Sequence, residues 1–266
     1  WMEGDAHGGH TVSACHFQNH EHAEYWVRKL VPTNKNGRFV KWSGGRRKVR
    51  SRSTFMANCL RHASEIDFRV NCISSLEGQM SWFAWAFYMQ NRNLVRQELD
   101  NKGRNCLVFP INQEVEFRFP VLRAGYLIWY HRVVEYLAQV KTIRGMVLSD
   151  NFCNDDFGTH SHAAQGVAFV NFLLSQSGQA LKVSLPTSDQ FRDLDRLSDC
   201  FCGWVNSVRL GLAPAEHERL LSEFEKHKGI FDSVVLAADI RVTDENGNDV
   251  TQLVKEKVAN DSPENG

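Results

Sequence analysis

Apolar and polar residues alternate along the chain in patterns that predict both strands and helices. The segment 67–76 alternates apolar with polar residues and therefore predicts a strand with one buried face. In the segment 78–99, large apolar residues recur at the spacing of a helix. From residue 122 to residue 140, apolar residues step by three and four, which predicts a long amphipathic helix.

Shorter signals predict the elements between these segments. Residues 1–17 alternate around the Gly8-Gly9 pair and predict a β-hairpin. Helices are also predicted over residues 20–31, 46–65, 162–178 and 193–211, and strands over residues 38–42, 115–119, 146–150 and 182–185. After Pro214 we expect one polar helix, a strand-like segment over residues 234–250 and a short tail.

This order of elements predicts an α/β fold. Strands alternate with helices, while the first two strands are expected to form a hairpin, so the sheet should be mixed rather than wholly parallel. We therefore expect an open mixed β-sheet with helices on both faces. The predicted organisation is a main domain over residues 1–213, a helix and β extension over residues 214–258, and a disordered tail over residues 259–266.

Composition and charge limit the classes of function. A chain of 266 residues with 42% hydrophobic residues can bury one substantial core. The formal net charge is zero, so binding to nucleic acid or to an anionic membrane would depend on a local patch of charge. The seven cysteines form no Cys-x-x-Cys pair and lie mostly in apolar runs, which is typical of a cytoplasmic protein. The longest apolar stretch is too short to span a bilayer, so we expect no membrane association.

Four acidic residues occupy positions that suit a ligand site. Asp150 ends a predicted strand, and ligands of open α/β sheets bind beyond the carboxyl ends of strands. Asp199 lies within or beside the apolar face of a predicted helix, where a carboxylate is costly unless it pairs or binds a metal. Glu3 and Asp5 lie on the first predicted strand. These acids could meet at one end of the sheet, although each of them also fits an ordinary turn or surface position.

Four short segments follow one another in a recognisable order. They are MEGDAHGG, FVKWSGG, VLSDNF and RLSDCFCGW, and together they cover roughly residues 1–205. In this order the chain resembles a remote member of the bacterial family called domain of unknown function 3800 (DUF3800). The resemblance implies an RNase H-like fold in which Asp150, Asp199 and either Glu3 or Asp5 occupy the acidic positions of a catalytic centre.

The chemistry of clustered carboxylates predicts what such a centre would do. Carboxylates bind Mg²⁺ or Mn²⁺, which prefer oxygen ligands, and these ions promote hydrolysis of phosphodiesters, so we expect a nuclease. Lys41 would be a phosphate or carboxylate partner at the edge of the site. The opening motif is degenerate, and Phe39 and Val40 replace an acid that the family often has before the lysine. These departures leave a second hypothesis, a module of the same fold that binds nucleic acid or a partner protein without catalysis.

A run of basic residues is the strongest local concentration of charge. Its members are Arg46, Arg47, Lys48, Arg50 and Arg52. Such a run suits contacts with the phosphates of a nucleic acid, and the affinity would then fall steeply as the salt concentration rises. A solvated helix face that contacts no ligand fits the same residues.

Overall fold

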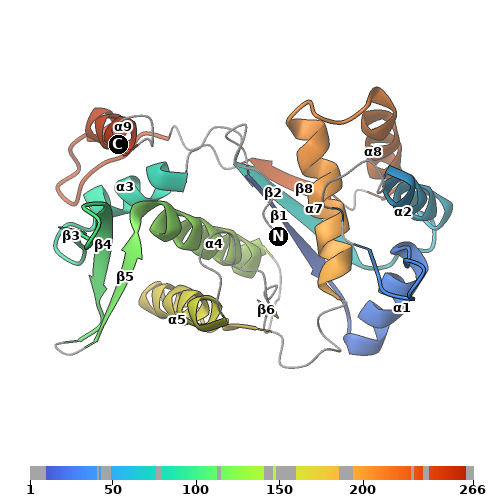
Figure 1. Cartoon of the computed structure of the whole chain (residues 1–266), viewed down its shortest axis with the longest axis horizontal. Coiled ribbons are helices and arrows are strands. Elements are labelled where there is room, and N and C mark those ends of the chain that lie inside the picture. Colours follow the sequence, from blue (N-terminus) through green and yellow to red (C-terminus); the bar gives the residue numbers. More distant parts are fainter. Residues whose placement is uncertain are drawn as a thin grey trace. The chain divides into compact units, whose positions relative to one another are not determined.

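The computed structural model divides the chain into two compact units (Figure 1). It describes residues 10–40, 42, 49–75, 80–112, 115–140, 146–147, 160–185, 194–228, 231–235 and 240–261. Unit 1 comprises residues 1–76 and 186–236, and unit 2 comprises residues 77–185 and 237–266. The described residues form eight helices and three small sheets, so the prediction of a mixed α/β protein is confirmed.

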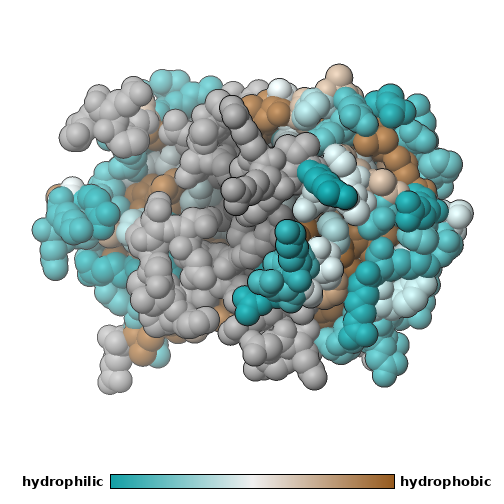
Figure 2. Space-filling model, turned by 45° about the vertical axis from the view of Figure 1, so that its right-hand side comes forward, coloured by the Kyte–Doolittle hydropathy of each residue, from teal (hydrophilic) through white to brown (hydrophobic). Residues whose placement is uncertain are grey.

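Most of the described residues on the face in Figure 2 are hydrophilic, and hydrophobic residues show mainly between them. Among the helices that the structure describes, none combines the length and the apolar composition needed to span a bilayer.

Unit 1 contains a mixed three-stranded sheet with the strand order β1-β2-β8. Its strands are β1 (His10–His16), β2 (Arg69–Ser75) and β8 (Phe231–Val235). β1 runs antiparallel to β2, with Thr11 opposite Ser74, and β8 runs parallel to β2. Among the described residues, β1 therefore pairs with a strand far along the chain. The other half of the predicted hairpin, in residues 1–9, lies outside the described part.

The central strand β2 is buried on both faces. Every residue from Val70 to Ser75 is buried, including the polar residues Asn71 and Ser74. Successive residues of a strand point to opposite faces, so polar groups are buried on both sides of the sheet. The prediction of a single buried face is therefore wrong, because the polar residues that alternate in this segment are not exposed to solvent.

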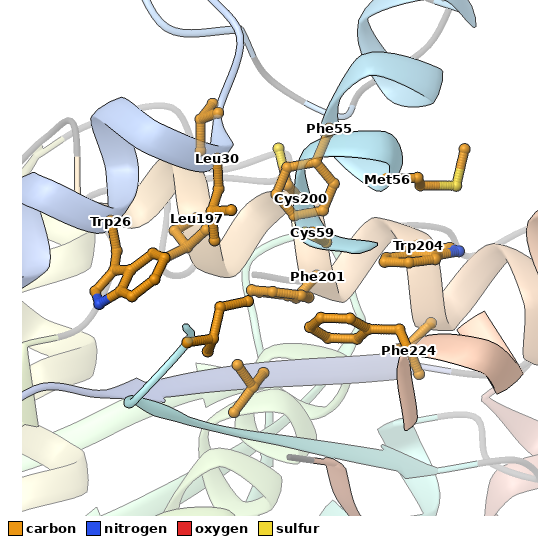
Figure 3. Packing of buried hydrophobic residues seen from close by; sticks show 14 of the residues in the cluster. Trp26, Leu30, Phe55, Met56, Cys59, Leu197, Cys200, Phe201, Trp204 and Phe224 are labelled. Carbon is orange, nitrogen blue, oxygen red and sulfur yellow. The ribbon is translucent and has the colours of Figure 1, made fainter. Parts of the chain in front are cut away.

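Four helices complete the described part of unit 1. They are α1 (His20–Leu30), α2 (Val49–Arg61), α7 (Asp195–Arg209) and α8 (Ala215–Lys228). α7 packs on β1 and β2, and α8 packs on α2 and α7. The rings of Phe55, Phe201, Trp204 and Phe224 lie together in the core of this unit (Figure 3). Burying one such side chain contributes about 2 kcal/mol, so this cluster holds the three helices in place.

Unit 2 combines helices with an antiparallel sheet and a short parallel pair of strands. Its described elements are α3 (Met80–Gln90), β3 (Arg96–Leu99), β4 (Asn105–Pro110), β5 (Glu116–Pro120), α4 (Val121–Val140), β6 (Met146–Val147), α5 (His160–Gln176), β7 (Val183–Ser184) and α9 (Thr251–Asn260). β3, β4 and β5 form the antiparallel sheet, while β6 pairs in parallel with β7. α3 packs closely along α4, because Gly125 of α4 has no side chain and faces the Met80 carbonyl.

Three elements of unit 2, namely β3, β4 and α9, differ from the sequence prediction. The helix predicted over residues 78–99 ends at Gln90 in the structure, and the last four residues of the predicted range form strand β3 instead. A turn fixes this strand, since the Asp100 side chain accepts hydrogen bonds from the backbone N–H groups of Lys102 and Arg104 at 2.8 and 2.9 Å. Gly103 has the positive φ, 73°, that this turn requires. Helix α9 has no counterpart among the predicted elements, because a single buried apolar residue gives no clear period.

Candidate functional site

The acid predicted in the helix 193–211 is buried in unit 1 and bound to a distant segment. Asp199 lies on α7 with 1% of its surface exposed. Its Oδ2 atom accepts a hydrogen bond of 2.7 Å from the backbone N–H of Trp42, which lies 157 positions earlier. Two of the four segments that carry the resemblance, FVKWSGG and RLSDCFCGW, therefore contact each other through this bond.

Trp42 is also held by a residue of the basic run. The Arg52 side chain, on α2, donates from Nε and Nη2 to the Trp42 carbonyl oxygen at 3.1 and 2.9 Å. The guanidinium lies over the indole ring, with Cζ 5.1 Å from the ring centroid. In this structure Arg52 is therefore engaged with the protein itself, at a position where the sequence predicts a contact with nucleic acid.

The indole of Trp42 fits against α7 where a glycine leaves room for it. A methyl group at Gly203 would lie 2.0 Å from Trp42 Cδ1 and 2.2 Å from Cγ, far inside van der Waals contact. An isolated glycine within a predicted helix is the sequence signal for such a close approach, and the sequence prediction does not use it. We call Asp199, Arg52 and Gly203 the Trp42 clamp, since together they fix the N–H group, the carbonyl group and the ring of this residue.

Two titratable groups close to the clamp are neutral at pH 7. Burial raises the pKa of the Cys200 thiol well above its usual range, and the charge of Asp199 raises it further. Burial lowers the pKa of the His217 imidazole, and the Arg52 cation lowers it further. At neutral pH the raised pKa keeps the thiol protonated and uncharged, and the lowered pKa favours the uncharged imidazole, so neither group places a charge beside Asp199.

Most of the other predicted site residues lie outside the described part of the chain. They are Glu3, Asp5, Lys41, Arg46, Arg47, Lys48 and Asp150. Arg50 is described, and its side chain is exposed on α2. Among the described residues, no three His, Cys, Asp or Glu side chains form a group that could hold a metal ion. Asp199 is thus the one predicted metal ligand whose surroundings can be described, and its carboxylate oxygens are of the type that Mg²⁺ and Mn²⁺ prefer.

A chain of hydrogen bonds, buried except at Arg209, joins α7 to both β1 and β2. Arg209 Nη1 donates to Ser74 Oγ at 2.5 Å, Ser74 and Thr11 share a bond of 2.7 Å, and Thr11 donates to Asn206 Oδ1 at 3.0 Å. Arg209 can only donate, and the amide oxygen of Asn206 can only accept, so each hydroxyl accepts one bond and donates the next. The sequence prediction misses this chain, because its residues come from three separate segments.

Comparison with known proteins finds no relative of this chain. No family model, no curated protein and no solved structure matches it. The resemblance to DUF3800 and the RNase H-like topology therefore stay predictions, and the functional argument depends on the geometry around Asp199 and Trp42.

Proposed function

We propose that the protein is a metal-dependent phosphodiesterase that cleaves nucleic acid on an RNase H-like scaffold. The observation that carries this proposal is the hydrogen bond between the Trp42 amide and Asp199. This bond joins α7, which carries Asp199, to the segment FVKWSGG, which carries Lys41 and Trp42, as expected if both segments belong to one site. The mixed sheet of unit 1, with α7 packed on it, agrees with the same proposal.

The residues of the chain would divide the work of this reaction. A bound Mg²⁺ or Mn²⁺ ion would supply an activated water and would stabilise the charge of the leaving oxygen. Asp199 would hold the ion, together with Asp150 and either Glu3 or Asp5 as the further ligands that the resemblance implies. Lys41 would contact the scissile phosphate. The cations proposed to bind the rest of the nucleic acid backbone are Arg46, Arg47, Lys48 and Arg50.

A second candidate is a module of the same scaffold that binds nucleic acid or a partner protein without cleaving it. The burial of Asp199 favours this candidate, because an acid with 1% exposure that binds a backbone amide already has a structural role. The two candidates differ in what they require of Asp199. The enzyme needs its negative charge, whereas the binding module needs only its hydrogen-bond acceptor.

An isosteric substitution separates these requirements. In Asp199→Asn, the amide oxygen can still accept the Trp42 N–H bond, but the charge that would hold a metal ion is removed. We expect this variant to remain folded by circular dichroism and to lose about a hundredfold or more of the Mn²⁺-dependent cleavage of labelled DNA and RNA. Asp199→Ala removes both the charge and the acceptor, so it should lose stability as well as activity.

Asp195→Asn is the matched control for this experiment. Asp195 lies one turn earlier on α7 and pairs with Arg196 at 3.3 Å, so its substitution removes an acid from the same helix. We expect cleavage by this variant to stay at the wild-type level. A wild-type protein with no cleavage in Mg²⁺ or Mn²⁺ would refute the enzymatic proposal, and so would an Asp199→Asn variant with full activity.

A further inference from the structure

Two residues of the Trp42 clamp have no direct part in the proposed reaction. Arg52 and Gly203 both contact Trp42, which in turn binds Asp199 through its N–H group. We propose that Arg52 and Gly203 are positioning residues, which hold Trp42 so that its N–H group fixes the orientation of the Asp199 carboxylate. The inference rests on the proposed function, which supplies the metal ion that the carboxylate would bind. The way in which the carboxylate is held follows from the observed contacts of Trp42.

The clamp restrains Trp42 at three points. The N–H group of Trp42 belongs to the peptide plane before the residue, and its carbonyl group belongs to the peptide plane after it. Because peptides are planar, only the rotations φ and ψ of Trp42 change the orientation of one group relative to the other. Asp199 binds the first of these groups and Arg52 binds the second, so the contacts restrict both backbone rotations. The ring is restrained separately, since the Arg52 guanidinium lies over the indole and the indole occupies the space that a side chain at position 203 would need. The N–H group consequently points at Asp199 Oδ2 in one defined direction.

This arrangement matches the support that metal ligands receive in proteins. A carboxylate that binds a metal is usually held by a hydrogen bond from a neighbouring group, and loss of that support weakens metal binding about 10- to 100-fold. Arg52 suits the task because its planar guanidinium can donate two bonds to one carbonyl while its face lies on an aromatic ring. A lysine ammonium, which is a compact charge, cannot make both contacts in this geometry.

The chain offers a matched control and a probe without charge. Arg61 is the last residue of the helix that carries Arg52, is exposed, and has no contact with Trp42 among those described. Gly203→Ala changes no charge, yet its methyl group would overlap the indole. Alanine has a higher helix propensity than glycine, so the substitution itself should not weaken α7. Any loosening of Trp42 in this variant would therefore come from the displaced ring.

The experiment measures the Trp42 amide and the metal affinity in the same samples. The chain has seven tryptophans, so ¹⁵N-tryptophan labelling of the full chain gives few signals, and a Trp42→Phe protein assigns the one from Trp42. We expect Arg52→Gln and Gly203→Ala to speed hydrogen exchange of the Trp42 amide at least about tenfold. By isothermal titration calorimetry, both should bind Mn²⁺ about 10- to 100-fold more weakly than the wild type, and Arg61→Gln should change neither quantity.

The outcomes separate this inference from the proposed function. Unchanged exchange of the Trp42 amide in folded Arg52→Gln and Gly203→Ala would overturn the inference. Faster exchange with wild-type Mn²⁺ affinity would also overturn it, because Trp42 would then not orient a metal ligand. A wild-type protein that binds no Mn²⁺ would refute the proposed function, while faster exchange in the two variants would still establish that the clamp holds Trp42. If Arg52→Gln does not fold, Arg52→Lys keeps the charge and should give the same faster exchange.

Discussion

Replacing Gly125 with alanine should force two helices of unit 2 apart. Gly125 lies on α4 where this helix meets the start of α3. The added methyl carbon would lie 1.8 Å from the Met80 carbonyl oxygen and 2.5 Å from its carbonyl carbon. Real contacts of such a carbon are essentially never shorter than 3.0 Å, so the two backbones must separate by at least about 1.2 Å (3.0 − 1.8).

The size of the effect follows from two opposing contributions. Overpacking of a tight contact costs about 1–3 kcal/mol, and the upper end applies here because a carbonyl group of the main chain cannot rotate away as a side chain can. Alanine gains about 1 kcal/mol over glycine from its preference for the helix. We therefore expect Gly125→Ala to lower the free energy of unfolding by about 2 kcal/mol, taking 3 as the cost and 1 as the gain.

Urea unfolding followed by circular dichroism measures this change. Gln139→Ala is the control, because Gln139 is exposed on the same helix and its substitution should change the stability by less than about 0.5 kcal/mol. A Gly125→Ala protein as stable as the wild type, or more stable, would contradict the close contact between α3 and α4.

Further predictions concern pH, thiol reactivity, salt dependence and the C-terminal helix. Burial lowers the pKa of His131 in the folded protein, so as the pH falls the unfolded chain binds a proton at this residue before the folded protein does. The free energy of unfolding should therefore decrease as the pH drops below about 6.5. The urea midpoint of His131→Gln should depend less on pH than that of the wild type. Burial raises the pKa of Cys15 to about 12, so a thiol reagent at mildly alkaline pH should label Cys15 only after denaturation, as peptide mass spectrometry would show. The triple substitution Arg46→Ala/Arg47→Ala/Arg50→Ala should reduce the slope of log affinity against log salt for duplex DNA by about two to three in fluorescence anisotropy, and an unchanged slope would indicate a solvated helix face. Lys257→Gln removes a cation 4.4 Å from the Trp85 ring centroid, so the α9 amides should exchange faster, and unchanged exchange would mean that this contact does not hold α9.

Helices with a clear apolar period could be predicted from the sequence alone. The ranges 122–140 and 193–211 agree with α4 and α7 to within two residues at either end. The period reports which face of a helix is buried, so it also predicted that Asp199 lies within or beside an apolar surface. The structure confirms that Asp199 is buried.

The contacts between elements that lie far apart in the chain could not be predicted from the apolar period. The contact of Asp199 is with a backbone N–H group, which every residue except proline has, so no sequence pattern identifies Trp42 as its donor. Arg52 has the same charge as its neighbours in the basic run, and only its place on α2 brings it onto the Trp42 carbonyl. Unit 1 is built from two separate stretches of chain, and local composition carries no sign of such a division.

The turn after β3 is a different case, because its signal is present in the sequence. Asp100 is followed three residues later by Gly103, and the same spacing recurs at Asp244 and Gly247. In both turns the aspartate side chain accepts two backbone N–H bonds and the glycine has a positive φ. The aspartate-to-glycine spacing is therefore a turn signal in both places, including the turn at Gly103, where no Asn or Asp directly precedes the glycine.

The chain of hydrogen bonds from Arg209 to Asn206 fixes the register of β1 against β2, which apolar residues alone do not fix in this sheet. A strand with one apolar face resists slipping by one residue, because a slip would expose that face. β2 is buried on both sides, so burial alone discriminates weakly between neighbouring registers. A slip of β1 by one residue would turn Thr11 to the opposite face and remove its hydroxyl from Ser74 and Asn206, so two hydrogen bonds of about 0.5–1.5 kcal/mol each would be lost. The hydroxyls therefore select the pairing of Thr11 with Ser74, and with it the position of every residue along β1.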